Sequence, residues 1–327
     1  DSDRQIFATT FSGEIYRYDP HSGYMVLFSQ LNQQLESILY PNIVGIAQYD
    51  SDNLVITTSK TLLKVNRFTG EATKLFDLSD TGEPDGWLRD LFVYKNYVLL
   101  AAYNGVIAYD MQSERYQHIA HIDPAQANED QLHTKVLTVQ QDKLWIGAVE
   151  GLYSIMLAEL DSYLLQQTPY QVKTEITKLN IWKLLWQDQF AYIPTELGLY
   201  KFTPETGLVT PILRLTDANQ DLSSDTIVDI IADVEGGFWL ASRDDGAYYW
   251  HPRSAAFTQI ALGESGNSGL SNDKVYSVLA DKNYLWVGTS NGLNRLNITT
   301  LKSDWFFVSD DPKAIQHDGS IGQIFPA

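Results

Sequence analysis

The sequence predicts an all-β fold, a seven-bladed β-propeller whose blades are four-stranded antiparallel sheets. Two observations lead to this prediction. A strand–turn–strand unit recurs seven times along the 327 residues with nearly constant spacing. Tyrosine and tryptophan, which favour strands, are abundant, with 19 and 8 copies. Because the repeats extend from one end of the sequence to the other, we expect residues 1–327 to form a single propeller domain.

The clearest repeat is the segment Leu-Trp-Val-Gly-Thr-Ser-Asn-Gly-Leu-Asn-Arg-Leu-Asn at residues 285–297. Its second glycine occupies a turn position that recurs in all units. The residues at this position are Gly13, Thr61, Gly105, Gly151, Gly198, Gly246 and Gly292. Successive positions are 44 to 48 residues apart and average 46.5. Propeller blades repeat roughly every 40–50 residues, so the spacing predicts one blade per unit.

Each unit is expected to contain four short strands. In the last unit these strands are residues 275–280, 284–289, 293–297 and 303–308. Residues 290–292 form the turn between the second and third strands, where glycine allows a positive φ. One helix-like stretch interrupts the pattern, at residues 156–167.

The two ends of the sequence predict how the ring closes. The first unit begins at its second strand and therefore lacks a first strand. Residues 320–325, Ser-Ile-Gly-Gln-Ile-Phe, match a first strand such as that at 274–279. We expect this C-terminal strand to pair into the first blade, which removes exposed sheet edges. The alternative is that it begins an eighth blade of a longer protein.

Composition narrows the class of partner. The protein has 23 Lys and Arg against 41 Asp and Glu, a formal net charge of −18, which argues against nucleic acid and bare anionic membranes. The absence of cysteine excludes disulfides, thiolate nucleophiles and Cys-ligated metals. The sequence contains no run of about 20 apolar residues, which is the length that a helix needs to span a bilayer. Because the sequence starts at Asp1 without a signal peptide, we expect a fragment of something longer.

No catalytic motif stands out. The six histidines are scattered, and there is no nucleophile elbow, phosphate-binding loop or zinc-protease motif. Acidic turns such as residues 50–53 are explained by turn chemistry more simply than by calcium. We therefore predict that the protein is not an enzyme, has no catalytic residues, and holds no metal or cofactor.

The repeat itself resembles a known family. An apolar strand, an Asp, and then the run Leu-Trp-Val-Gly-Thr-x-x-Gly-Leu-x-x-Leu-Asn are similar to the two-component regulator propeller repeat. The match is fullest in unit seven, good in units four and six, and degenerate elsewhere. The resemblance implies the extracytoplasmic sensor part of a membrane-bound receptor, with a histidine kinase, hybrid kinase or diguanylate cyclase as output. It carries over no binding residues, because the family has no fixed set of them.

Ligands of propellers usually meet the central channel and the loops of one face. One position in the expected first strands is small or polar although the strands are otherwise apolar. It holds Gly45, Asp90, Thr138, Lys183, Asp229, Ser277 and Gln323. A packed strand tolerates such residues poorly, so we expect this row to face the channel. The position before it holds Val44, Arg89, Leu137, Trp182, Val228, Tyr276 and Gly322.

These two rows and the neighbouring turns supply a predicted ligand-binding set. It consists of Arg89, Asp90, Tyr103, Trp182, Lys183, Asp229, Arg243 and Tyr276. Arginine suits a carboxylate, aromatic faces suit sugars or peptides, and the mixed charges suit a neutral or zwitterionic polar ligand. The simpler interpretation is that the polar row solvates a wet channel and that Trp182 packs between blades. By contrast Trp145, Trp239 and Trp286 recur at one repeat position, which predicts an inter-blade core role.

The sequence thus predicts a periplasmic ligand-sensing propeller of a transmembrane signalling receptor. Its ligand would be a small polar molecule, such as an oligosaccharide, bound at the channel. In the parent receptor, transmembrane and output domains would follow on the C-terminal side, and a homodimer is one possible assembly. Two alternatives stay open. The propeller could be a protein-docking platform without a small ligand, or a lyase or lactonase, which would need a catalytic histidine or a buried metal at the channel.

Overall fold

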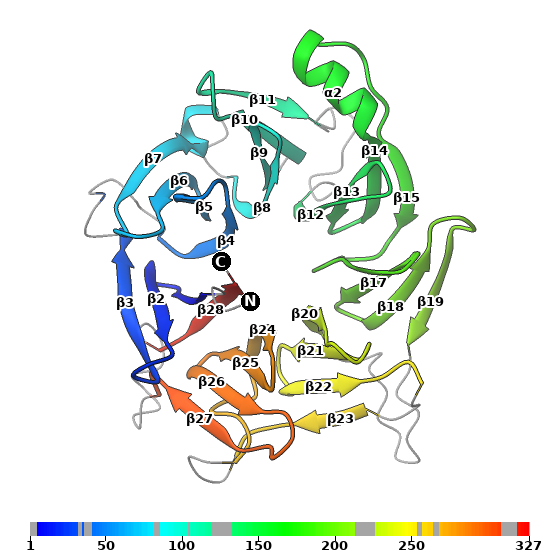
Figure 1. The fold of residues 1–327 in the computed structure, drawn as a ribbon. Coiled ribbons are helices and arrows are strands. Elements are labelled where there is room, and N and C mark those ends of the chain that lie inside the picture. Colours follow the sequence, from blue (N-terminus) through cyan, green and yellow to red (C-terminus); the bar gives the residue numbers. More distant parts are fainter. Residues whose placement is uncertain are drawn as a thin grey trace.

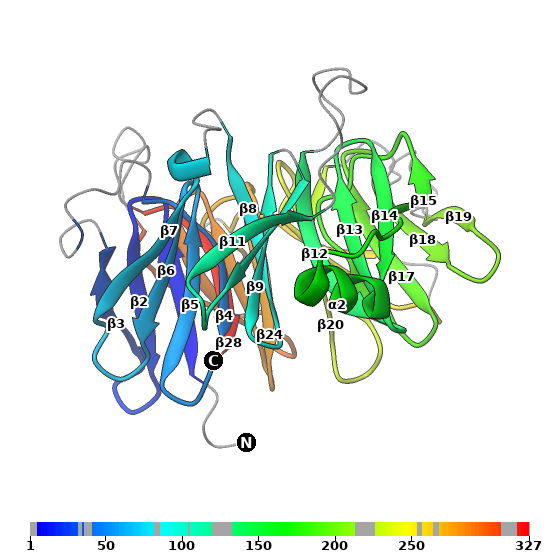
Figure 2. The ribbon, with the colours of Figure 1, turned by 90° about the horizontal axis from the view of Figure 1, so that it is seen from above.

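The structure is a computed structural model, and it describes residues 5–31, 35, 41–81, 86–103, 105–119, 133–212, 226–253, 257–263, 268–308 and 319–326. Within these residues seven four-stranded antiparallel sheets stand around a central axis (Figure 1). After a rotation of 90° the sheets are seen to stand side by side around the ring (Figure 2). The seven-bladed prediction is confirmed.

The first four blades are described from the inner to the outer strand. Blade one contains β28 (Ile321–Pro326), β1 (Ile6–Thr10), β2 (Glu14–Asp19) and β3 (Tyr24–Gln30). Blade two contains β4 (Ile43–Gln48), β5 (Asn53–Thr58), β6 (Thr61–Asn66) and β7 (Ala72–Asp77), followed by the short helix η1 (Leu78–Thr81). Blade three contains β8 (Leu88–Tyr94), β9 (Tyr97–Ala102), β10 (Gly105–Asp110) and β11 (Arg115–Ile119). Blade four contains β12 (Thr134–Gln140), β13 (Lys143–Ala148), β14 (Gly151–Met156) and β15 (Lys173–Thr177).

The last three blades repeat the same order. Blade five contains β16 (Leu185–Gln187), β17 (Phe190–Thr195), β18 (Gly198–Thr203) and β19 (Leu208–Ile212). Blade six contains β20 (Ile227–Ala232), β21 (Phe238–Ser242), β22 (Ala247–Trp250) and β23 (Phe257–Ile260). Blade seven contains β24 (Val275–Asp281), β25 (Tyr284–Thr289), β26 (Gly292–Asn297) and β27 (Ser303–Phe306).

The ring closes as the sequence predicted. The C-terminal strand β28 pairs antiparallel with β1, with Phe7 opposite Phe325 and Ala8 opposite Ile324. The two phenyl rings stack with centroids 5.7 Å apart. Blade one is therefore built from both ends of the sequence, which gives it an inner strand like those of the other blades.

The hydrophobic core lies between blades. Each large cluster of buried apolar residues draws on two neighbouring sheets, as where Trp145 of blade four packs with Ile193 and Phe202 of blade five. Trp286 of blade seven is 1% exposed and packs with Ile6 and Ala8 of blade one. Trp239 is also buried, so the prediction of a core role for these three tryptophans is confirmed.

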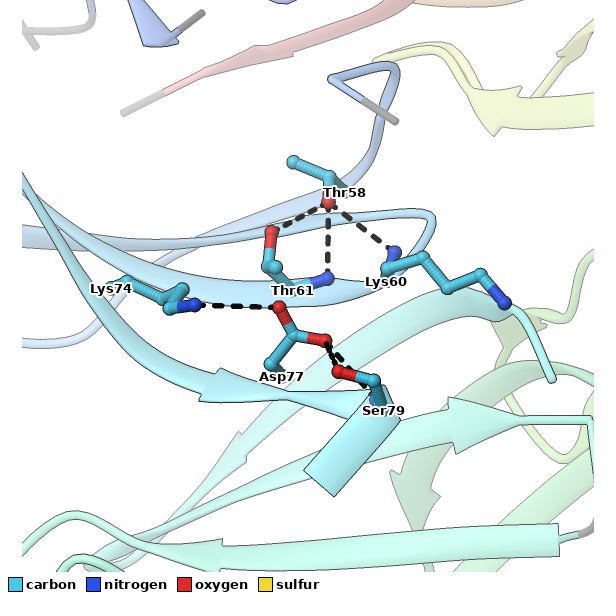
Figure 3. A network of polar contacts seen from close by, with 6 residues as sticks. All are labelled: Thr58, Lys60, Thr61, Lys74, Asp77 and Ser79. Carbon is cyan, nitrogen blue, oxygen red and sulfur yellow. Dashed lines mark hydrogen bonds and ion pairs between the residues drawn. The ribbon is translucent and has the colours of Figure 1, made fainter. Parts of the chain in front are cut away.

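The turn between the second and third strands explains the repeated glycine. Gly292 has a φ of +103°, and an added Cβ would lie 2.5 Å from the Phe306 carbonyl oxygen. Blade two makes the same turn with Thr61 in place of glycine. There the Thr58 hydroxyl accepts hydrogen bonds from the N–H groups of Lys60 and Thr61, at 3.3 and 3.0 Å (Figure 3). An equivalent threonine hydroxyl also accepts a backbone N–H in blades that keep the glycine, as Thr289 does from Asn291 at 3.2 Å in blade seven.

The helix-like stretch is confirmed as α2 (Leu157–Gln166), inserted between β14 and β15. Leu160 and Leu164 are buried on one side of it, and both join a core cluster shared with blade three. Asp161 accepts hydrogen bonds from Tyr94 and Lys95 of blade three, at 2.9 and 2.6 Å. The helix therefore ties blade four to blade three at the outer edge of the ring (Figure 1).

Candidate functional site

A β-bulge at the start of the inner strands identifies equivalent positions around the ring. In blade three the register shifts between Leu88 and Asp90, and blades two, four, six and seven shift at the matching point. We call the residue after the bulge, such as Asp90, the axial position. The residue directly before the axial residue, such as Arg89, occupies the mouth position. The axial residues are Gly45, Asp90, Val136, Lys183, Asp229, Ser277 and Gln323. The mouth residues are Val44, Arg89, Lys135, Trp182, Val228, Tyr276 and Gly322.

In blade four this register corrects the sequence alignment by two residues. Val136 follows the bulge and pairs with Gly147, as Asp90 pairs with Ala101 in blade three. Thr138 lies farther along the strand, opposite Trp145. Thr138 and Leu137 were therefore wrong assignments, made because Thr138 is a polar residue in a mainly apolar strand. The mouth position of blade four belongs to Lys135, which the sequence analysis missed.

Two axial carboxylates join neighbouring blades. The inner strand is the free edge of each sheet, so its alternate N–H groups have no partner strand. Asp90 accepts a hydrogen bond from the Leu137 N–H in the next blade at 3.0 Å. Asp229 does the same for the Val278 N–H at 3.0 Å. Gln323 reaches the Val44 carbonyl of blade two in a similar way. Part of the polar row therefore holds the inner strands together.

Lys183 supplies a positive charge on blade five, between the blades that hold the two carboxylates. All three side chains keep part of their surface exposed, although protein surrounds them closely. Burial raises the pKa of Asp90 and of Asp229, while Lys183 and backbone N–H groups act in the opposite direction. Burial by itself would lower the pKa of Lys183, but the charges of Asp229 and Asp90 raise it overall. The axial row thus carries opposite charges around the axis, as the sequence predicted.

The mouth positions gather cations around one indole ring. The Lys135 Nζ lies 3.4 Å from the centroid of the Trp182 ring, and the Arg243 Cζ lies 4.6 Å from it. Lys135 is the second residue of β12 in blade four, Trp182 lies before β16 in blade five, and Arg243 follows β21 in blade six. The Trp182 backbone N–H donates to the Pro194 carbonyl at 3.0 Å, which fixes the backbone at the indole.

Hydrogen bonds and charges around Lys135 complete this cluster. Its ammonium donates to the Asn180 side-chain oxygen at 2.7 Å, and the Asn180 amide donates to Glu196 at 2.9 Å. Burial, followed by the positive charge of Arg89, lowers the pKa of Lys135 to about 8. Glu196 partly offsets this shift, and Arg243 adds to it. We call Arg89, Lys135, Trp182 and Arg243 the mouth cluster.

The remaining predicted residues make separate contacts. Tyr276 packs edge-on against Phe11 of blade one, with ring centroids 5.3 Å apart, and Lys274 lies 5.9 Å from its ring centroid. Tyr103 lies against His133, with centroids 3.7 Å apart. The structure thus divides the predicted set into the axial charges, the mouth cluster and two outlying tyrosines. Lys135 could have been found from the sequence only with the bulge in blade four placed correctly.

Two further findings concern only the part of the protein that the structure describes. There, no group of three or more His, Asp or Glu side chains is arranged to hold a metal ion. In the same residues no helix is both long and apolar enough to cross a membrane.

Comparison with known proteins agrees with the repeat analysis. Residues 269–291 match the family described as two component regulator propeller. This segment lies in unit seven, where the repeat is fullest, and the predicted resemblance is confirmed. The search of curated protein sequences finds no match.

Several solved structures share the fold. One is the extracellular domain of BT4673 from B. thetaiotaomicron, described as a one component system, with a TM-score of 0.63 and 15% identity over 95% of this protein and 47% of that one. Another is the extracellular domain of the hybrid two component system BT3049 from B. thetaiotaomicron, with a TM-score of 0.59 and 15% identity over 86% of this protein and 37% of that one. A third is PorZ of Porphyromonas gingivalis, a surface component of the type-IX secretion system. Its TM-score is 0.63, with 14% identity over 87% of this protein and 42% of that one. The sequence therefore spans less than half the length of each, and the likeness establishes the fold.

Proposed function

We propose that this propeller is the ligand-sensing module of a transmembrane signalling receptor and binds a small polar ligand where the mouth cluster meets the axial charges. The family match and the extracellular signalling domains among similar structures support a sensing or docking propeller. The parent receptor would place the propeller in the periplasm and carry transmembrane and output domains after it.

The observation that carries the proposal is the concentration of unlike polar groups near one axis. Asp90, Lys183 and Asp229 keep exposed surface between closely packed inner strands, and Trp182 with its cations lies one residue away from Lys183. Such groups can make several hydrogen bonds to one small molecule at once, and an indole adds an apolar contact. Lys183 lies between blades that each carry one of the two carboxylates, so the charges on the row are mixed and can meet both donor and acceptor groups of a polar ligand.

The arrangement favours binding over catalysis. Asp90 and Asp229 already accept backbone hydrogen bonds from the next blade, so both have a structural task that fixes them in place. A docking platform that uses the rim of the ring is the second candidate, because PorZ, a surface component of a secretion system, shares the fold.

The test is isothermal titration of the purified protein with neutral sugars, sugar acids, amino acids and short peptides. The same panel is applied to Lys183→Met and Trp182→Phe. The matched control is Lys201→Met, because Lys201 lies in the same blade on β18 and faces Phe190 at 3.4 Å from its ring centroid. We expect at least one member of the panel to bind the parent and the control, and to bind both site variants more weakly.

Two results would overturn the proposal. A ligand that binds Lys183→Met and Trp182→Phe as tightly as the parent would place the site elsewhere on the ring. A panel in which nothing binds the parent would favour the docking platform. Melting curves of each variant separate a lost site from a lost fold.

A further inference from the structure

We infer that the mouth cluster is a carboxylate-binding site, in which Arg89, Lys135 and Arg243 hold the carboxylate of a small, singly charged organic acid beside Trp182. This inference rests on the proposed function and names the chemical class of its ligand. The sequence suggested a neutral or zwitterionic ligand instead, because the sequence alignment did not place Lys135 among the site residues.

The first argument is the local balance of charge. Arg89 of blade three and Arg243 of blade six both act on Lys135 of blade four, in a protein whose formal net charge is −18. Glu196 is the acidic group that acts on Lys135, and it is exposed and already accepts a hydrogen bond from Asn180. The cluster therefore keeps a local excess of positive charge, and a bound anion would balance it.

The second argument is that this excess is built into the fold. Lys135 is partly buried, its position is set by the bulge of β12, and its ammonium is oriented by Asn180 at 2.7 Å. The Arg243 backbone N–H donates to the Thr226 carbonyl at 2.9 Å, which fixes the backbone that carries the guanidinium. Cations held in place before binding lose little conformational freedom when an anion arrives. Burial is the largest cause of the low pKa of Lys135, and the charge of Arg89 comes second, so the ammonium is both partly desolvated and close to another cation.

A second lysine–tryptophan contact, which lies in the core and has only a structural role, provides a comparison. The Lys143 Nζ lies 5.0 Å from the Trp145 ring centroid in blade four. There the ammonium is paired with the Glu175 carboxylate at 3.3 Å, and Trp145 is fully buried. Lys135 instead has an amide oxygen as its partner, and Trp182 keeps exposed surface. The difference lies in the missing carboxylate, which the ligand would supply.

The net charge of the whole protein weakly disfavours a second negative charge on the ligand. At physiological salt, charges more than about 8 Å away are largely screened, so the mouth cluster dominates close to the site. The excess of acidic residues still disfavours each further negative charge on approach. A carboxylate therefore fits better than a doubly charged phosphate.

The test compares D-glucuronate, D-glucose and inorganic phosphate, titrated at neutral pH into the full-length propeller and its variants. Glucuronate and glucose share the same ring and differ in the carboxylate. We expect glucuronate to bind at least tenfold more tightly than glucose or phosphate, and Lys135→Met or Arg243→Gln to lose about tenfold of that affinity each. The matched control Lys143→Met should bind glucuronate like the parent.

The pH dependence separates a charge from a packing role. Glucuronate needs the protonated form of Lys135, so its affinity should fall as the pH rises through about 8. Lys135→Arg keeps its charge at every pH tested and should bind glucuronate with a flat profile. A flat profile in the parent would overturn the role of Lys135.

The outcomes also distinguish this inference from the proposed function. Glucose binding that matches glucuronate, with both weakened in Trp182→Phe, would overturn the carboxylate site and leave a sensing site intact. Tighter binding of phosphate would replace the carboxylate by a phosphoryl ligand. No binding of any of the three probes, together with an empty wider panel, would overturn both.

Discussion

The Lys135 ammonium lies 3.4 Å from the centre of the Trp182 indole ring, although the two residues belong to neighbouring blades. The contact exists because a β-bulge at the start of β12 places Lys135 where blade three has Arg89. A one-residue insertion repeated around the ring thus collects side chains from several blades at one mouth. At these bulges, Asp90 and Asp229 bond the next blade, and the residues directly before them belong to the row in which we propose a ligand site.

Trp286→Ala should cost roughly 3–5 kcal/mol of unfolding free energy, because it removes a fully buried ring from the interface between blades seven and one. Trp182→Ala should cost less, because Trp182 keeps part of its surface exposed. Chemical denaturation of both variants measures the difference. Equal losses would show that Trp182 is also a core residue.

Asp90→Ala should cost about 1–3 kcal/mol, because the Leu137 N–H at the free edge of blade four loses its acceptor. Thr138→Val is the matched control, since the register places Thr138 two residues beyond the axial position of its blade. We expect Thr138→Val to be nearly neutral. A larger loss for Thr138→Val than for Asp90→Ala would contradict the register assigned to the inner strands.

Asp229→Asn should change how stability depends on pH. Burial raises the folded-state pKa of Asp229 above its ordinary value of 3.8, so the folded protein binds more protons than the unfolded polypeptide just above that pH. The contribution of Asp229 to stability therefore falls as the pH rises through this window. Relative to the parent, Asp229→Asn should gain stability as the pH rises above the ordinary pKa of 3.8. Denaturant midpoints across this range test it, and a relative loss would mean that Lys183 outweighs burial.

Removal of divalent metal should leave the melting temperature unchanged. The acidic turn at Asp50 is satisfied from within, because its carboxylate accepts hydrogen bonds from the N–H groups of Asp52 and Asn53, both at 2.8 Å. Scanning calorimetry with and without a chelator checks this expectation. A melting temperature lowered by several degrees would reveal a structural calcium ion.

Much of the architecture could be predicted because one short pattern is repeated seven times. The glycine or threonine turns, the recurring tryptophan and the matching C-terminal strand depend on local sequence, and each was placed correctly. The axial charges Asp90, Lys183 and Asp229 were also found, because charged residues are rare in strands that pack on both sides.

The mouth cluster could be predicted only in part. A bulge shifts the register by one residue without a strong sequence signal, and in blade four Thr138 drew the alignment away from Val136. Arg89, Trp182 and Arg243 were recognised as candidates, but nothing in the sequence shows that Lys135 and Arg243 lie over the same ring. That relationship depends on how three blades are arranged around the axis.

The most direct test of the account is fluorine NMR of the protein labelled with 5-fluorotryptophan. The sequence has 8 tryptophans, and Trp182→Phe identifies the resonance of the residue at the mouth. On titration with D-glucuronate, the account predicts that the Trp182 signal moves and that the signals of the core residues Trp145 and Trp286 stay in place. Binding that leaves the Trp182 signal unmoved would contradict a ligand site at the mouth of the channel.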